Sequence, residues 1–159
     1  MSRYDELRAR FTGSPDERIA LLEQMLREPL ETATALAADL GALDPSRGAA
    51  LFGGRFGELV EILAISAAKL GEVAKQLPAL RERSRAVGGA REEDIHAFRH
   101  DLLTPLGTVR GVAGMLAQTD LSQAPDLPAD FAAKVQELVR AMNELKDVLD
   151  ALTDARVRQ

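Results

Sequence analysis

The feature that most constrains this chain is a repeated spacing of apolar residues. In three long stretches they recur in steps of three and four, which places them along one face of an α-helix. One stretch carries Phe56, Leu59, Leu63, Ser66, Leu70, Val73, Leu77 and Leu80, in which Ser66 is the one polar member. Another carries Ile95, Phe98, Leu102, Leu106, Val109, Ala113 and Leu116. The most regular stretch carries Phe131, Val135, Leu138, Met142, Leu145, Leu149 and Leu152. Helices with such seams pack seam against seam, as in a coiled coil or helical bundle.

The composition supports an all-α protein and excludes several functions. Aromatic residues make up only 4% of the chain, and alternating β-branched runs are almost absent. Without cysteine there is no disulfide, thiolate zinc site or cysteine nucleophile. The net charge of −5 argues against nucleic-acid binding, because no basic face replaces the counterions. No apolar run approaches the ~20 residues that a bilayer requires, and the opening residues lack a signal-peptide core. We therefore expect a cytoplasmic protein without nucleic-acid or membrane partners.

Residues 1–89 are predicted to form an N-terminal helical segment that acts as an input or regulatory unit. Ser14-Pro15-Asp16-Glu17 is a helix start, with Ser14 as N-cap and Pro15 in the first turn. Pro29 is expected to kink or divide that helix, which stops at Gly41. A short helix follows from Asp44-Pro45 to Gly53-Gly54, and then the long seam from Phe56, with a bend at Pro78.

Residues 90–159 are predicted to form an antiparallel helical hairpin. Gly88-Gly89 marks a hinge or break before it, although one continuous helix is the alternative. A polar connection, Gln118 to Leu127, joins its two helices, and Pro128 and Asp130 suit the first turn of the second. A lone hairpin cannot cover both apolar seams. Two hairpins paired in a homodimer would form a four-helix bundle, whereas the chain's own first ninety residues are the other available cover. The sequence leaves both covers open.

The chemistry-bearing residues lie in the middle of the first hairpin helix. His100 and Thr104 fall nearly opposite the apolar seam, one turn apart, and Asp101 follows His100 directly. Pro105 has no N–H for the carbonyl of Asp101, so the helix should bend there. A histidine on the outer face of a bundle helix, beside an acid, is well placed to accept a group from a large partner.

The run His100-Asp101-Leu102-Leu103-Thr104-Pro105-Leu106 resembles the H-box of the sensor histidine kinases. That pattern is His, Glu or Asp, Leu, usually Arg or Lys, Thr or Asn, Pro, Leu. The resemblance continues to Met115-Leu116 and, with the last helix, covers about Glu92 to Arg156. Leu103 departs from it, since the family has a basic residue there that can contact phosphate or the ATP-binding domain.

The resemblance implies a homodimeric dimerisation and histidine-phosphotransfer domain of a two-component system. His100 would carry the phosphoryl group, attacking through Nε2, because neutral imidazole is available near pH 7. Asp101 would hold or deprotonate the Nδ1 side. Thr104 would orient a water in the reverse, phosphatase direction. The implied partner is a response-regulator receiver domain with an aspartate, and Gly107 and Gly111 would leave the outer face smooth for its docking.

The chain has no Gly-rich ATP lid, no Asn-containing or Asp-x-Gly motif of the kinase ATP-binding domain, and no P-loop. We therefore expect no cofactor in this chain. ATP and Mg²⁺ would act only through a separate catalytic domain, either following Gln159 or on another protein that would then be a further partner. Whether the protein counts as an enzyme depends on that domain.

Two other functions fit the same sequence. A helical dimeric adaptor would keep the bundle without using the H-box chemistry, and the departure at Leu103 favours it. The N-terminal helices could instead hold a ligand as a sensor, although no convergent polar set indicates one. His96 and His100 are an i,i+4 pair, but without further ligands they do not predict a metal site.

Overall fold

The computed structural model describes residues 14–49, 51–120, 122 and 124–153. Residues 1–13, at the start of the first predicted segment, and 154–159, at the end of the second, lie outside this description. The all-α prediction is confirmed, since the ordered elements are helices. They are α2 (Pro15–Gly41), the 3₁₀ helices η1 (Pro45–Gly48) and η2 (Leu51–Gly54), α3 (Phe56–Ala74), α4 (Gln76–Ala86), α5 (Glu92–Ala117) and α6 (Phe131–Thr153).

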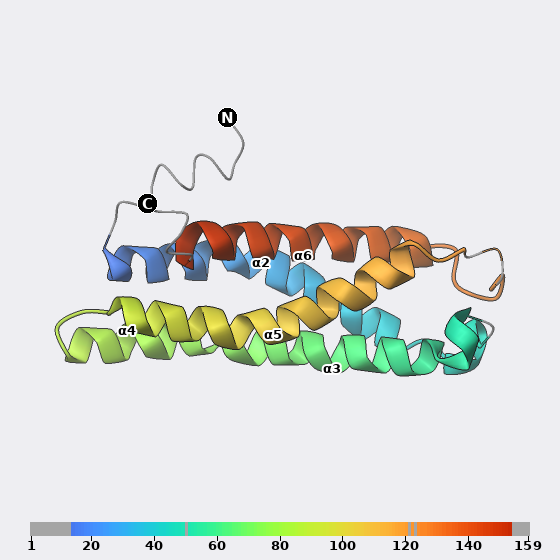
Figure 1. Ribbon diagram of the computed structural model, residues 1–159, viewed down its shortest axis with the longest axis horizontal. Coiled ribbons are helices and arrows are strands. Elements are labelled where there is room, and N and C mark those ends of the chain that lie inside the picture. Colours follow the sequence, from blue (N-terminus) through green and yellow to red (C-terminus); the bar gives the residue numbers. More distant parts are fainter. Residues whose placement is uncertain (1–13, 50, 121, 123, 154–159) are drawn as a thin grey trace, which may run out of the picture.

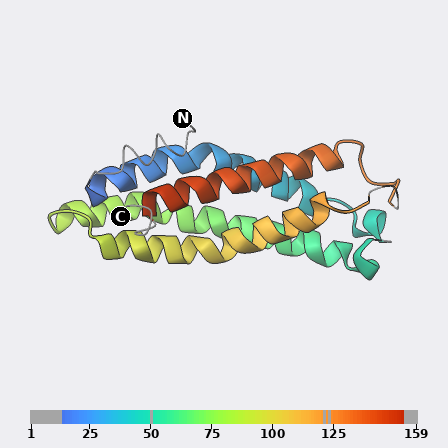
Figure 2. The same ribbon diagram turned by 45° about the horizontal axis from the view of Figure 1, so that its top comes forward.

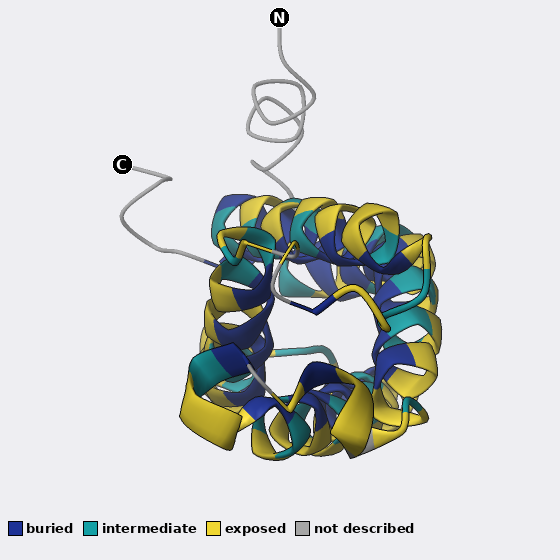
Figure 3. Ribbon diagram, turned by 90° about the vertical axis from the view of Figure 1, so that its right-hand side faces the viewer, coloured by how far each residue is buried: buried dark blue, intermediate teal, exposed yellow. Residues whose placement is uncertain are grey.

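The helices form an up-and-down bundle of four rods, in which α4 continues the rod of α3 (Figure 1). Each rod runs antiparallel to the one before it. Of the four, α2 packs against α3 and α6, and α5 packs against the same two helices from the other side. Figure 2 shows the same arrangement from a second angle. Seen from the end, the buried faces of all four rods point inward (Figure 3).

The predicted helix start is present, and of the two prolines expected to disturb helices in the first segment, Pro29 and Pro78, only Pro78 divides one. Ser14 caps α2, since its Oγ accepts from the Glu17 amide at 3.3 Å. Pro29 lies inside α2, which remains one helix. The seam from Phe56 is divided at Lys75, because Pro78 has no N–H for the carbonyl of Ala74.

The break between α4 and α5 is confirmed at two glycines with positive φ, 89° at Gly88 and 130° at Gly89. The last helix begins later than predicted. Pro128 and Asp130 precede α6, and the Asp130 carbonyl accepts the amide of Lys134 at 3.0 Å. Asp130 and Lys134 also form an i,i+4 ion pair, with Lys134 Nζ 3.3 Å from an Asp130 carboxylate oxygen.

One apolar core fills the bundle, and it contains the seams predicted for α5 and α6. Every residue of the seam from Ile95 to Leu116 is buried, as is every residue of the seam from Phe131 to Leu152. In the α3–α4 rod, Leu59 and Ser66 are only partly buried, and the other seam positions are buried. Because α2 and α3 cover the hairpin of α5 and α6, the bundle closes within one chain. This is the second of the two covers that the sequence left open, and the homodimer remains a prediction.

The first turns of α2 tie the glycine break to the bundle. The Asp16 carboxylate accepts the backbone amide of Ala90 at 3.0 Å. The guanidinium of Arg18, 1% exposed, pairs with Glu92 and donates to the carbonyl of Leu152 at 3.5 Å. These contacts fix the start of α5 against the first and last helices.

Candidate functional site

The site is built on the middle of α5, whose buried face holds the helix firmly. The Asp94 carboxylate accepts the Arg91 amide at 3.0 Å, and three acidic residues in the first turn suit the positive end of the helix dipole. Leu102 and Leu106 are 0% and 1% exposed. The opposite face is therefore displayed in a fixed orientation.

The three site residues predicted from the sequence are all exposed. His100, Asp101 and Thr104 lie on the outer face of α5, whereas Pro105, the residue after Thr104, is buried. Figure 1 shows α5 changing direction near its middle, as the proline predicts. The missing amide of Pro105 leaves the Asp101 carbonyl without its helical partner. The hydroxyl of Thr108 donates to the Thr104 carbonyl at 3.2 Å.

The three residues share one shallow groove with residues of α3. This groove, called the His100 groove below, has a volume of about 250 Å³. Its α5 wall is the exposed run just described, and α3 contributes Ser66 and Lys69. The complete lining is Ser66, Lys69, His100, Asp101, Thr104, Pro105 and Thr108.

Lys69 and Ser66 are the site residues that the sequence analysis missed. Ser66 was counted as a seam position, and Lys69 lies one turn further along the same helix. The available signal was a hydroxyl in an otherwise apolar seam with a lysine at i+3. Nothing in the spacing of either helix indicated that α3 would lie beside the His100 face of α5.

Lys69 is an exposed cation without a partner in the described part of the chain. It makes no hydrogen bond or ion pair with any residue that the structure describes. The same holds for the imidazole nitrogens of His100 and the carboxylate of Asp101, within that part of the chain. Neighbouring residues on a helix point about 100° apart, so His100 and Asp101 do not face each other. The predicted contact of Asp101 with Nδ1 therefore stays a prediction.

On the opposite flank of His100, towards α6, the basic residue is Arg99, and its guanidinium is paired within the protein. A hollow of about 850 Å³ there includes His96, His100 and Leu103. The Arg99 guanidinium in its wall lies 2.8 Å from Asp150 and donates to the Thr153 hydroxyl at 3.0 Å. Leu103, at the position where the family has a basic residue, lines this flank. The unpaired cation beside His100 therefore comes from α3.

Beyond the groove, the same face of the bundle carries three exposed apolar side chains. Ile62 and Ile65 are 42% and 61% exposed, and they lie one turn from Ser66 and Lys69 on α3. Met115, 48% exposed, lies two turns beyond Thr108 on α5. Because α3 and α5 run antiparallel, both groups extend from the groove towards the same end of the bundle (Figure 1).

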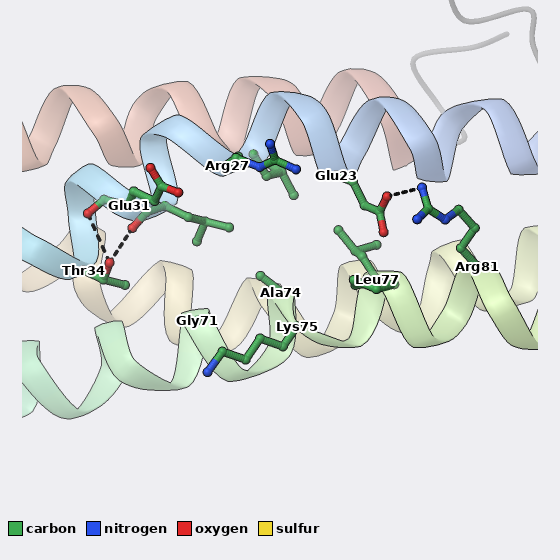
Figure 4. Close-up of a pocket in the computed structure, with 12 residues that line it drawn as sticks. Glu23, Arg27, Glu31, Thr34, Gly71, Ala74, Lys75, Leu77 and Arg81 are labelled. Atoms are coloured by element: carbon green, nitrogen blue, oxygen red, sulfur yellow. Dashed lines mark hydrogen bonds and ion pairs between the residues drawn. The ribbon is translucent and has the colours of Figure 1, made fainter.

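A second groove lies between α2 and the α3–α4 rod, with a volume of about 450 Å³ (Figure 4). Its floor includes leucine and alanine side chains, and its rim is charged. Arg81 pairs with Glu23 at 2.7 Å, and the Thr34 hydroxyl donates to the Leu30 carbonyl at 2.8 Å. The side chains of Arg81, Glu23 and Thr34 thus make contacts within the chain, and a ligand held by the N-terminal helices stays a prediction.

Comparison of the chain with protein-family models, with characterised proteins and with solved structures found no match. Among the residues that the structure describes, no group of three or more His, Cys, Asp or Glu side chains is arranged to hold a metal ion. Over the same residues, none of the helices combines the length and the apolar character needed to cross a membrane.

Proposed function

We propose that this chain is a cytoplasmic phosphoacceptor of two-component signalling, in which His100 exchanges a phosphoryl group with an aspartate of a receiver domain. The observation that carries the proposal is the exposed imidazole in an open groove beside the unpaired Lys69. The H-box pattern from His100 to Leu106 gives the same residue this role by resemblance. The proposed transfer needs no homodimer, because the bundle buries its seams without a second chain.

Phosphoryl transfer needs an accessible nucleophile, room for in-line approach and compensation of the phosphate charge. Nε2 of His100 attacks the phosphorus of the receiver's aspartyl phosphate. The N–P bond forms as the bond from phosphorus to the carboxylate oxygen breaks, and the carboxylate leaves as an anion. The Nδ1 proton passes to Asp101 and then to solvent, which requires the two side chains to turn towards each other. Transfer to the receiver reverses these steps.

The rest of the face suits a protein partner. An exposed apolar cluster beside a polar centre is typical of protein-binding surfaces. Here the cluster is Ile62, Ile65 and Met115, and the polar centre is the His100 groove. A Cβ added at Gly107 or Gly111 would meet nothing within 4 Å, so a partner can approach the α5 backbone closely. These features support docking of a folded domain.

The test is phosphate transfer from receiver domains labelled on aspartate with acetyl phosphate. We expect label on this chain that is lost in acid and stable in base, as phosphohistidine is. His100→Ala should abolish it, whereas His96→Ala, which removes the other exposed histidine of the helix, should leave it unchanged. Label that persists undiminished in His100→Ala would contradict the proposal.

A non-catalytic adaptor is the second candidate. It is favoured by Leu103 in place of a basic residue and by the lack, among the described residues, of any hydrogen bond that orients His100. An adaptor predicts that His100→Ala and Asp101→Ala leave partner binding and signalling output unaffected. Loss of output in these variants, with binding retained, supports phosphotransfer instead.

A further inference from the structure

The first half of the bundle repeats the second in sequence. When α2 is laid on α5 without gaps so that Pro29 falls on Pro105, the two helices that contain an internal proline match along their length. Both prolines are buried. The identical pairs are Glu17 and Glu93, Ile19 and Ile95, Leu26 and Leu102, Pro29 and Pro105, Leu30 and Leu106, Thr32 and Thr108, Ala37 and Ala113, and Leu40 and Leu116.

The second helix of each half repeats in the same way. Here the ungapped alignment is shifted by one residue relative to the first. Phe56, the first residue of α3, then corresponds to Phe131, the first residue of α6. The same alignment also carries the seam of the α3–α4 rod onto that of α6. The identical pairs are Phe56 and Phe131, Val60 and Val135, Leu63 and Leu138, Leu70 and Leu145, Val73 and Val148, and Leu77 and Leu152.

Apolar seams alone can produce such matches, but the polar connections match as well. After α2 and α5 the chain has Asp44-x-Ser46 and Asp120-x-Ser122, which correspond in the same alignment as the two prolines. In each, the serine amide donates to the aspartate Oδ1 at 3.0 Å. The helix C-caps correspond too, with φ and ψ of −83° and −7° at Ala42 and −91° and −3° at Gln118.

The two copies, residues 15–86 and 92–153, pack as the subunits of a two-fold dimer do. The first helix of each copy packs against both second helices, its own and that of the other copy (Figure 3). Equivalent residues meet where a two-fold axis would pass, since the rings of Phe56 and Phe131 lie 5.8 Å apart between centroids. Contact between equivalent residues is the mark of an isologous interface.

Only the second copy carries the acceptor chemistry. The positions of His100, Asp101 and Thr104 are occupied in the first copy by Gln24, Met25 and Glu28. The counterpart of Lys69 is Glu144, which would repel a phosphate. The two sets of positions related by the repeat therefore differ in charge, and the set in the first copy lacks the nucleophile.

We propose that this chain is a duplicated hairpin in which the first copy replaces the second subunit of a dimer, and that its single acceptor site is completed by Lys69 of the first copy beside His100 of the second. The proposal rests on the proposed function. Beyond that function, it states that Lys69 supplies the positive charge for the phosphate and that each chain has a single acceptor site.

Lys69 supplies a positive charge beside His100, which Leu103 does not provide at the position where the family has Arg or Lys. A phosphoryl group on Nε2 of His100 carries about two negative charges. The ammonium of Lys69 lines the same groove and has no partner among the described residues, so it is free to pair with phosphate oxygens. A cation from α3 approaches from the α3 flank of α5, whereas the family's basic residue would lie on the α6 flank with Leu103.

The first measurement is the molar mass of the full chain by light scattering after size exclusion. A chain that contains both halves of the dimer should be a monomer of 17.2 kDa. A stable homodimer at micromolar concentration would overturn the replacement of the second subunit.

The second measurement uses phosphoramidate, which phosphorylates imidazole directly and needs no cognate partner. The P–N bond of phosphoramidate breaks as the P–Nε2 bond forms, and ammonia leaves with the imidazole proton as ammonium. We expect one phosphate per chain on His100, detected by ³¹P NMR, and faster labelling there than at His96. Lys69→Ala should slow labelling of His100 by about tenfold, the effect of losing one hydrogen bond to a charged group. Lys69→Arg should retain most of the rate.

Lys75→Ala is the matched control, since Lys75 is also exposed on this rod but lines the groove between α2 and the α3–α4 rod. It should leave the labelling rate unchanged. Unfolding midpoints should be the same for all these variants, which separates a lost phosphate contact from a lost fold. If His100 is not labelled above His96, the proposed function fails. If His100 is labelled but Lys69→Ala and Lys75→Ala behave alike, only the role of Lys69 fails.

Discussion

The glycines on the outer face of α5 allow stability and partner docking to be separated by the same substitution. Gly107 and Gly111 lie in the helix interior, on the face that carries His100, and an added Cβ at either position would have no neighbour within 4 Å. With alanine the unfolded chain has less conformational freedom than with glycine, so less is lost on folding. The methyl group of alanine also leaves less of the helix backbone exposed to water. Each Gly→Ala change should therefore stabilise the fold by about 0.5–1 kcal/mol.

For the double variant Gly107→Ala/Gly111→Ala the expected gain is about 1–2 kcal/mol, if the two changes add. In a chain of this size that raises the thermal midpoint by about 2–8 °C. Urea unfolding followed by circular dichroism at 222 nm should show a higher midpoint with an unchanged slope. Gly41→Ala is the control, because its Cβ would lie 2.8 Å from the Cβ of Ala64 in α3, and it should lower the midpoint.

Phosphotransfer from receiver domains to the same double variant should slow, because two methyl groups would stand between the partner and the α5 backbone. Labelling by phosphoramidate should not change, since that small donor needs no docking face. If the unfolding midpoint does not rise, the inference that a Cβ at these two positions meets no neighbour is wrong. A raised midpoint with unchanged receiver transfer would show that the partner does not dock over these glycines.

Three further predictions concern the core, a buried cation and one carboxyl group. Leu102→Ala, at a fully buried position beneath the site, should lower the free energy of unfolding by about 3–5 kcal/mol in urea titrations. Arg18→Met should keep or raise that free energy, since Glu92 is 67% exposed and stays hydrated when Arg18 is replaced, whereas Arg18→Ala should lower it by leaving a cavity. The Ser122 hydroxyl and then its amide lower the pKa of Asp120, so Ser122→Ala should raise that pKa in an NMR titration. Because the folded pKa is the lower one, this contact stabilises the chain above the unfolded pKa and is lost as pH falls through the folded value.

The sequence was a good guide wherever one helix decides the outcome by itself. The seam of α5 determined which face is buried, and so it also determined that His100 and Thr104 are exposed. The glycine pair before α5 marked a real break, because two consecutive positive φ values end any helix. Pro78 was located correctly but its effect was underestimated, since the rod divides before it.

The internal repeat was also visible in the sequence, as an ungapped match of the two proline-containing helices, but its polar signal is weak. Most matching positions are seam residues that any two amphipathic helices could share. The tertiary structure adds that both matched Asp-x-Ser turns have the same hydrogen bond from the serine amide to the aspartate Oδ1.

By itself the sequence determined the helices, their buried faces and the exposure of His100, because these depend on residue type and on the period of the α-helix. Only the tertiary structure decided what covers the second hairpin and which residues surround His100. Seams made of leucine, valine and alanine pack against one another with little selectivity. Their spacing therefore does not predict which helix packs against which. Once α3 packs beside α5, Lys69 reaches the groove of His100, and a side chain distant in sequence becomes part of the site.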